Sequence, residues 1–174
     1  GLSLQGSLSN FAGGILILIL KPFVVGDYVS ACGCEGTVAV ISPFYTTLHT
    51  VDNRNVVLPN GSLSNSNITN YSANEIRRVD MSVDVGYGSD LKKAREVIMD
   101  ILNQDGRILK DPAPVVAVDN LGDSGVNVLI RPWVRCEDYW TVKWTVLEAV
   151  YDRLNAEKID IPFPQMTVHL DQNP

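Results

Sequence analysis

The spacing of apolar positions changes along the chain, and the N-terminal part is the most apolar. Before Lys21 no residue is charged, and residues 11–20 are an unbroken apolar or small run. That run is shorter than the roughly 20 residues that cross a bilayer, and residues 15–20 alone would also fit a buried strand. Pro22 disfavours helical geometry at the preceding residue. We therefore predict the end of a membrane helix, or a helix at the membrane boundary, that stops at Lys21.

The next 50 or so residues change to short segments rich in Val, Thr and Tyr, separated by turn residues. Asp52-Asn53 and Pro59-Asn60-Gly61 are typical turn sequences. A β-module of this size is marginally stable alone, and an oligomer would supply further burial. The pattern predicts a small antiparallel module with strands at residues 28–31, 36–41, 45–51 and 55–58.

The second half of the chain combines strict alternation with helical periodicity. Residues 79–85 alternate apolar and polar positions, which predicts a half-buried strand. Two amphipathic patterns predict helices, one capped by Ser89 or Asp90. The order strand–helix–strand–strand–helix indicates an α+β fold of the split βαβ type. The further predicted elements are helices at 91–104 and 139–156, strands at 115–118 and 126–134, and a last strand at 166–170.

Composition narrows the class of protein. The chain has 174 residues, of which 45% are hydrophobic and 20% charged, as in a folded domain or two small ones. Its formal net charge is −6, and its 14 Lys and Arg are scattered. Nucleic-acid-binding surfaces need clustered basic residues, so we expect no nucleic-acid partner.

The cysteines do not predict a disulfide framework. They are Cys32, Cys34 and Cys136, an odd number that includes a C-x-C pair, and a reduced environment fits them better. Tetrahedral zinc needs about four ligands, and only His49 and His169 would add to these thiols. We interpret Cys32 and Cys34 as two small residues on either side of a turn glycine, and we expect no metal site. A redox or metal-dependent role of this turn is the alternative.

Candidate catalytic residues do not form a recognisable set. Neither histidine lies in a catalytic motif, and a nucleophile and its base must be within hydrogen-bonding reach. Gly86-Tyr87-Gly88 precedes a helix but completes neither common phosphate-binding motif, and we interpret it as a turn. Trp140 and Trp144 are four residues apart on one helix face, which favours packing. We therefore expect neither an enzyme nor a cofactor.

Short motifs follow one another over nearly the whole length of the chain. In this order and spacing they resemble the small-conductance mechanosensitive channels of bacterial type, from the pore-lining helix to the C-terminal signature. The motifs are the first 16 residues, Lys21-Pro22-Phe23, Gly26-Asp27, Gly36-Thr37-Val38, Thr46-Thr47, Val57-Leu58-Pro59-Asn60-Gly61, Asn70-Tyr71-Ser72 and Pro162-Phe163-Pro164-Gln165-Met166.

The resemblance implies an α+β multidomain architecture. Residues 1–22 would be the C-terminal part of a pore-lining transmembrane helix, followed by a small Sm-like β-domain over 23–73. Residues 74–160 would form an α/β domain, split βαβ and ferredoxin-like. Residues 161–174 would supply one strand to a parallel barrel that is shared between subunits.

The resemblance also implies a function. The protein would be a membrane-tension-gated, poorly selective pore that releases ions and small osmolytes on hypo-osmotic shock. It would be a homoheptamer in the cell membrane (inner or plasma), in contact with lipids and multi-pass, with this region mostly cytoplasmic. Because the chain begins at Gly1 without an initiator Met, we expect it to be part of a longer protein.

Six residues match functional positions of that family. Leu2 would form the pore constriction, where a ring of leucines blocks ions because a narrow apolar neck dewets. Gly6 matches the point where the pore helix kinks, and Gly14 a second flexible point. The other matches are a gating-associated polar position, Asn10, and the membrane junction, Lys21 and Pro22.

Two other classes of function are weaker hypotheses. The β-module would also fit an Sm-like barrel that binds RNA, but the net negative charge and the lack of a basic, aromatic groove oppose it. A hydrolase or metalloenzyme lacks any set of residues that would carry the chemistry.

Overall fold

The computed structural model describes residues 1–172, and the chain divides into two compact units between Glu75 and Ile76. The first unit joins the N-terminal helix to a β-domain, and the second is an α/β domain with a C-terminal tail. Each unit has its own hydrophobic core. The predicted boundary at residue 74 lies within two residues of this division.

Helix α1 (Leu2–Leu20) is continuous and ends where the sequence predicts. Lys21 adopts the left-handed conformation with φ 47°, and its amide donates to the Ile17 carbonyl at 2.9 Å. A left-handed residue at this place is a usual helix terminator, and Pro22 then prevents the helix from continuing. The helix runs through Gly6 and Gly14 without interruption.

The β-domain is a five-stranded antiparallel sheet with the order β4-β3-β2-β1-β5. The four predicted strands are confirmed. The interpretation of Pro59-Asn60-Gly61 as a simple turn was wrong, because Asn60 starts a short helix, and the three-residue strand β5 was missed. The elements are β1 (Tyr28–Ala31), β2 (Cys34–Ile41), β3 (Tyr45–His49), β4 (Asn55–Pro59), α2 (Asn60–Ser64) and β5 (Ile68–Asn70).

The C-x-C pair forms the tight turn between β1 and β2. Cys32 and Gly33 both have positive φ, 52° and 72°, as a two-residue type I′ hairpin requires. The Cys32 thiol contacts the Ser66 hydroxyl at 3.5 Å. Within residues 1–172 no group of three or more His, Cys, Asp or Glu is placed to hold a metal ion.

The second unit contains a split βαβ motif, as predicted. Its three-stranded sheet has the order β7-β9-β8, and both outer strands pair antiparallel with β9. The outer strands are therefore parallel to each other, with α3 as their connection. The elements of the sheet and its helices are β7 (Met81–Val85), α3 (Leu91–Gln104), β8 (Val115–Leu121), β9 (Val126–Arg131) and α4 (Tyr139–Ala156).

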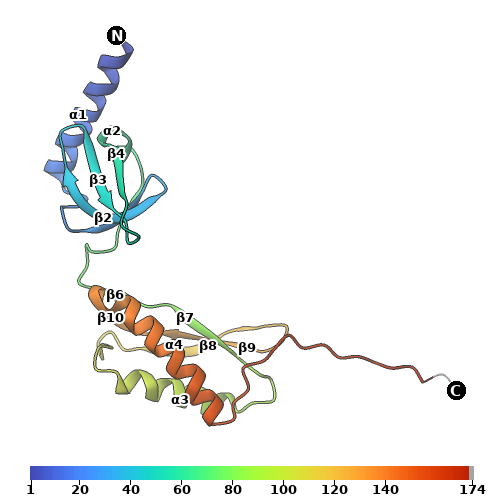
Figure 1. The fold of residues 1–174 in the computed structure, drawn as a ribbon. Coiled ribbons are helices and arrows are strands. Elements are labelled where there is room, and N and C mark those ends of the chain that lie inside the picture. Colours follow the sequence, from blue (N-terminus) through green and yellow to red (C-terminus); the bar gives the residue numbers. More distant parts are fainter. Residues whose placement is uncertain (173–174) are drawn as a thin grey trace. The chain divides into compact units, whose positions relative to one another are not determined.

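Helices α3 and α4 cover one face of this sheet (Figure 1). The side chains of β9 alternate between buried and half-buried, as expected when only one face is packed. Asp90 caps α3 and accepts a hydrogen bond from the Lys93 amide at 3.0 Å. The predicted strand 126–134 is two strands, because Pro132 lacks an amide to donate. The second part, β10 (Trp133–Arg135), pairs with β6 (Ile76–Arg78) and precedes the short helix η1 (Cys136–Asp138).

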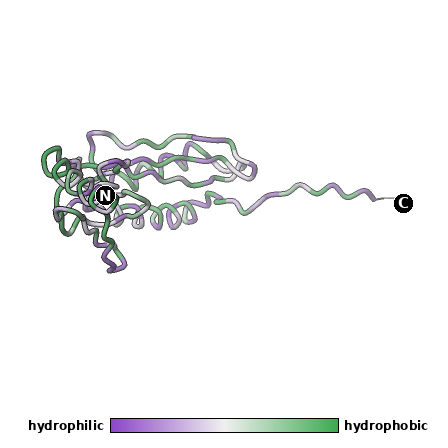
Figure 2. The backbone as a smooth tube through the Cα atoms, turned by 90° about the horizontal axis from the view of Figure 1, so that it is seen from above, coloured by the Kyte–Doolittle hydropathy of each residue, from purple (hydrophilic) through white to green (hydrophobic). Residues whose placement is uncertain are grey.

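Residues 166–170, predicted as a strand that pairs with neighbouring subunits, form no strand within this single chain, and the prediction of a shared barrel stays a prediction. A strand requires a neighbour for its amides and carbonyls, and none of the described residues pairs with this segment. Figure 2 shows an extended tail in which hydrophobic and hydrophilic residues alternate. Met166 and Leu170 are 84% and 83% exposed.

Candidate functional site

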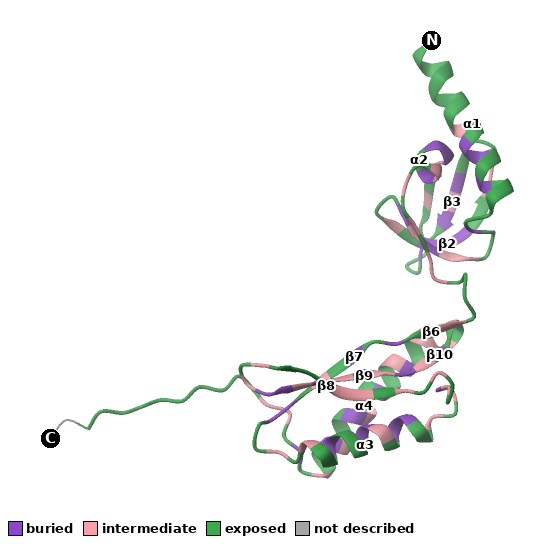
Figure 3. Ribbon diagram, turned by 180° about the vertical axis from the view of Figure 1, so that it is seen from behind, coloured by how far each residue is buried: buried purple, intermediate pink, exposed green. Residues whose placement is uncertain are grey.

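Helix α1 has an uncovered N-terminal part and a C-terminal part that packs on the β-domain. Leu2, Leu4 and Leu8 are exposed, whereas Gly13, Gly14 and Ile17 are buried (Figure 3). The helix is 19 residues long and is the one described helix that is long and apolar enough to cross a membrane. So much exposed apolar surface on one element indicates contact with lipid or with other protein.

Two adjacent glycines bring α1 against the β-domain. A Cβ atom on Gly13 would lie 2.5 Å from the carbonyl oxygen of Asn60, and one on Gly14 would lie 2.5 Å from that of Pro43. Both obstacles are backbone atoms, which cannot rotate away as a side chain can. We call the contact formed by Gly13, Gly14, Pro43 and Asn60 the glycine seat.

Asn60 holds the glycine seat together from within the β-domain. Its side chain is completely buried, accepts a hydrogen bond from the Thr46 hydroxyl at 2.7 Å and donates one to the Ser42 carbonyl at 2.7 Å. Its own amide donates to the Phe44 carbonyl at 2.9 Å. One residue therefore joins β3, the loop before it and the start of α2, and it fixes the two carbonyls that α1 contacts.

We expect Asn60→Ala to lower the free energy of unfolding by about 2–4 kcal/mol. The substitution leaves the buried Thr46 hydroxyl and the Ser42 carbonyl without their partner and opens a cavity. The measurement is thermal or denaturant unfolding of the detergent-solubilised chain. Asn65→Ala is the matched control, because Asn65 is exposed at the end of the same helix and donates one bond, to the Gly61 carbonyl. Equal losses for the two variants would show that the buried network contributes little.

Asn10 adds a directed contact between α1 and α2. Its side-chain oxygen accepts a hydrogen bond from the Gly61 amide at 3.0 Å. This amide lies in the first turn of α2, where no helical carbonyl is available to it. The next residue, Phe11, packs its ring against that of Phe44, with centroids 5.8 Å apart.

The junction after α1 is fixed by polar contacts around Asp27. The Asn70 amide group donates to the Pro22 carbonyl at 3.1 Å and to the Asp27 carboxylate at 2.9 Å. The same carboxylate accepts from the Val24 amide at 2.9 Å, and the Phe23 ring is buried in the core of the β-domain. The segment after α1 is therefore fixed by backbone hydrogen bonds at Pro22 and Val24 and by burial of the Phe23 ring.

Comparisons with known proteins identify the family of this architecture. Residues 6–73 match the family described as "Mechanosensitive ion channel, beta-domain", and residues 79–161 match "Mechanosensitive ion channel MscS, C-terminal". The crystal structure of Helicobacter pylori MscS in its closed state is similar over 99% of this chain and 68% of that one, with 35% identity and a TM-score of 0.92. The chain belongs to the MscS family.

Curated MscS-family sequences agree with this match. An MscS family protein of Synechocystis is 43% identical over 99% of this chain, and the small-conductance mechanosensitive channel of Edwardsiella ictaluri is 41% identical over 99%. The chain spans 58% and 60% of the length of these two relatives. The cryo-EM structure of Arabidopsis thaliana MSL1, at 19% identity and a TM-score of 0.76, shares the fold.

The structure brings only some of the predicted MscS site residues together. Asn10 and Gly14 both contact the β-domain, Asn10 through Gly61 and Gly14 in the glycine seat, where close packing leaves no room for a Cβ atom. Leu2 is 89% exposed, and a Cβ on Gly6 would meet nothing within 4 Å. Lys21 terminates the helix, and the Pro22 carbonyl is held by Asn70.

Sequence reasoning found only Gly14 of the glycine seat and missed Gly13, Pro43 and Asn60. Asn60 was interpreted as part of a turn, and Gly13 was not distinguished from the other glycines of the helix. A signal was present for Gly13, because two adjacent glycines in an apolar helix are expensive for helix formation and favour a close approach of backbones. No signal in the sequence predicts the burial of Asn60.

Proposed function

We propose that this chain is the pore-end and cytoplasmic part of a subunit of a membrane-tension-gated, poorly selective channel. The channel releases ions and small osmolytes on hypo-osmotic shock. The observation that carries the proposal is α1, an apolar helix that no acidic or basic residue interrupts, free at one end and docked on the β-domain at the other. The exposed N-terminal part of such a helix can line a pore, and its docked C-terminal part can connect movement of the pore to the β-domain.

The gate in this proposal is a ring of Leu2 side chains from the copies of the subunit. Leucine side chains in a narrow neck expel water, so ions do not pass although the neck is not closed by direct contact. Membrane tension favours the state of larger area, in which the ring is wide enough to wet. Gly6, where an added Cβ would meet nothing within 4 Å, is the position where α1 bends or straightens between the two states.

The glycine seat is the mechanical connection between the pore helix and the β-domain. Gly13 and Gly14 allow backbone contact, and Asn10 adds a hydrogen bond to α2. Movement of the N-terminal part of α1 therefore occurs against a held C-terminal part. Gly14 is a second flexible point only if this contact opens.

The assembly in this proposal is a homoheptamer in the cell membrane, with lipids around further transmembrane helices of a longer, multi-pass protein. Lys21 lies at the membrane boundary, where its amine reaches the headgroups, and most of the remaining chain is cytoplasmic. The exposed, alternating tail supports a shared parallel barrel, since strands from neighbouring subunits would supply the partners that the single chain lacks.

Patch-clamp recording of the full-length parent in a host without its own mechanosensitive channels tests the proposal. We expect stepwise currents that begin above a threshold of suction and stop when it is released. Cells that carry the empty vector are the control. Silent patches with correctly inserted protein would overturn tension gating, and a strong preference for one ion would contradict the poor selectivity.

A further inference from the structure

A pocket in the α/β domain has a composition that suits a ligand. It has a volume of about 380 Å³ and lies between the last turn of α3 and the loop that follows it. This volume is within the range of small-molecule sites in proteins, roughly 300–1,000 Å³. The walls are mainly apolar and are formed by Met99, Leu102, Ile108, Leu109, Ala113 and Pro114.

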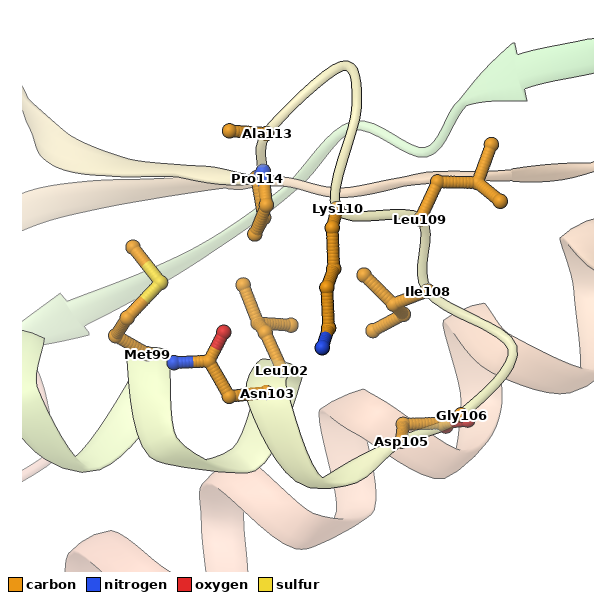
Figure 4. Close-up of a pocket in the computed structure, with 10 residues that line it drawn as sticks. All are labelled: Met99, Leu102, Asn103, Asp105, Gly106, Ile108, Leu109, Lys110, Ala113 and Pro114. Carbon is orange, nitrogen blue, oxygen red and sulfur yellow. The ribbon is translucent and has the colours of Figure 1, made fainter.

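The polar groups of the pocket are few, and one of them, the exposed Lys110 amine, has no ion-pair partner among the described residues. Figure 4 shows the Lys110 side chain extending from the loop toward α3, between Leu102 and Ile108. Among residues 1–172 no carboxylate lies within 4.0 Å of its amine. Asn103 also lines the pocket and offers a second donor.

The one acidic residue in the lining is already engaged. Asp105 accepts hydrogen bonds from the Arg107 guanidinium at 2.9 Å and 2.7 Å. These bonds hold the pKa of the Asp105 carboxyl below its usual value, so the group stays ionised and paired. Its charge is balanced by Arg107, which leaves the Lys110 amine as the uncompensated charge of the pocket.

We propose that this pocket binds a small monocarboxylate with an apolar chain. The carboxylate accepts from the Lys110 ammonium and the Asn103 amide, and the chain lies against Leu102, Ile108 and Pro114. A polyanion such as a phosphate ester fits less well, because Lys110 is the one cation among the described lining residues, and its single charge matches a monocarboxylate. The inference is independent of the proposed pore.

Methionine-methyl NMR of the full chain in detergent micelles, titrated with sodium hexanoate, tests this site. The described methionines are Met81, Met99 and Met166: Met99 lines the pocket, Met81 is in the core and Met166 is on the exposed tail. We expect the Met99 signal alone to shift saturably, with half-saturation at about 1 mM, usual for a ligand of this size. Hexylammonium, of the same length and opposite charge, is expected not to saturate.

Two variants locate the charge contact. Lys110→Met keeps a flexible apolar chain and removes the charge, and we expect it to weaken hexanoate binding about tenfold or more. Lys110→Arg should restore binding in part, and Lys92→Met, which removes an exposed charge of α3, should leave it unchanged. Unchanged affinity in Lys110→Met, equal shifts of Met99 and Met166, or no saturable shift up to about 50 mM would each overturn the proposal.

Discussion

Leu2→Ser in the full-length channel is expected to produce a pore that conducts without applied tension and impairs growth of the host. A hydroxyl on each copy of residue 2 lets water remain in the neck, and the dewetting barrier to ions is then lost. The effect is large because the substitution is repeated in every subunit of the ring. The measurements are the open probability at zero suction and the growth rate of cells after induction.

Leu4→Ser is the matched control for the gate. The two leucines are both exposed on α1, but they are two residues apart and therefore point to nearly opposite sides of the helix. Only one of them can face the pore axis. We expect Leu4→Ser to leave the channel closed at rest, and a leak in this variant equal to that of Leu2→Ser would contradict the assignment of Leu2 as the constriction.

Gly13→Ala is expected to disrupt the docking of α1 and to lower the free energy of unfolding by about 1–3 kcal/mol. The new methyl group would lie 2.5 Å from the Asn60 carbonyl oxygen, which the surrounding hydrogen bonds hold in place. The helix therefore moves away, and the Asn10 bond to Gly61 is lost with it. The measurements are unfolding of the solubilised chain and hydrogen exchange of the Gly61 amide, which should become faster.

Gly6→Ala is the control, because it makes the same chemical change in the same helix at a place without neighbours. Nothing lies within 4 Å of a Cβ at Gly6, and alanine is the better helix former, so we expect α1 to be stabilised by up to about 1 kcal/mol. Equal behaviour of the two variants would mean that α1 does not approach the β-domain closely. The comparison thus separates a packing role of glycine from a role in flexibility.

The pair of variants also bears on how gating is transmitted. If the glycine seat is the connection between pore helix and β-domain, Gly13→Ala should shift the tension threshold of the parent channel as well as its stability. Gly6→Ala stiffens the expected bend and leaves the seat intact. If Gly13→Ala and Gly6→Ala change the tension threshold differently, this would support a model in which the C-terminal part of α1 is fixed to the β-domain and the N-terminal part moves.

The sequence by itself determined the features whose causes lie within a few residues. The end of α1 follows from Pro22, which cannot continue a helix and disfavours helical geometry at Lys21. The left-handed conformation of Lys21 was not predicted. The start of α3 follows from the Asp90 cap, and periodicity predicted α4 over about residues 139–156. Alternation over residues 79–85 predicted β7, because a one-sided sheet requires it.

The candidate site was predictable only in part. Leu2, Gly6, Asn10 and Gly14 were found through resemblance to the family, since nothing in composition or spacing separates them from other residues of the helix. Their contacts were not predictable in that way. The bond from Gly61 to Asn10 joins residues 51 positions apart, and no local pattern encodes that pairing.

Only the tertiary structure decided which features meet. Asn60 is buried because β3, its preceding loop and α1 all converge on it, and its amide satisfies two groups that burial would otherwise leave without partners. Strand β5 is too short for a periodic signal and exists because β1 offers it an edge. The tail shows the converse: it has the alternation of a strand, but a strand needs a partner, and within one chain the described residues supply none.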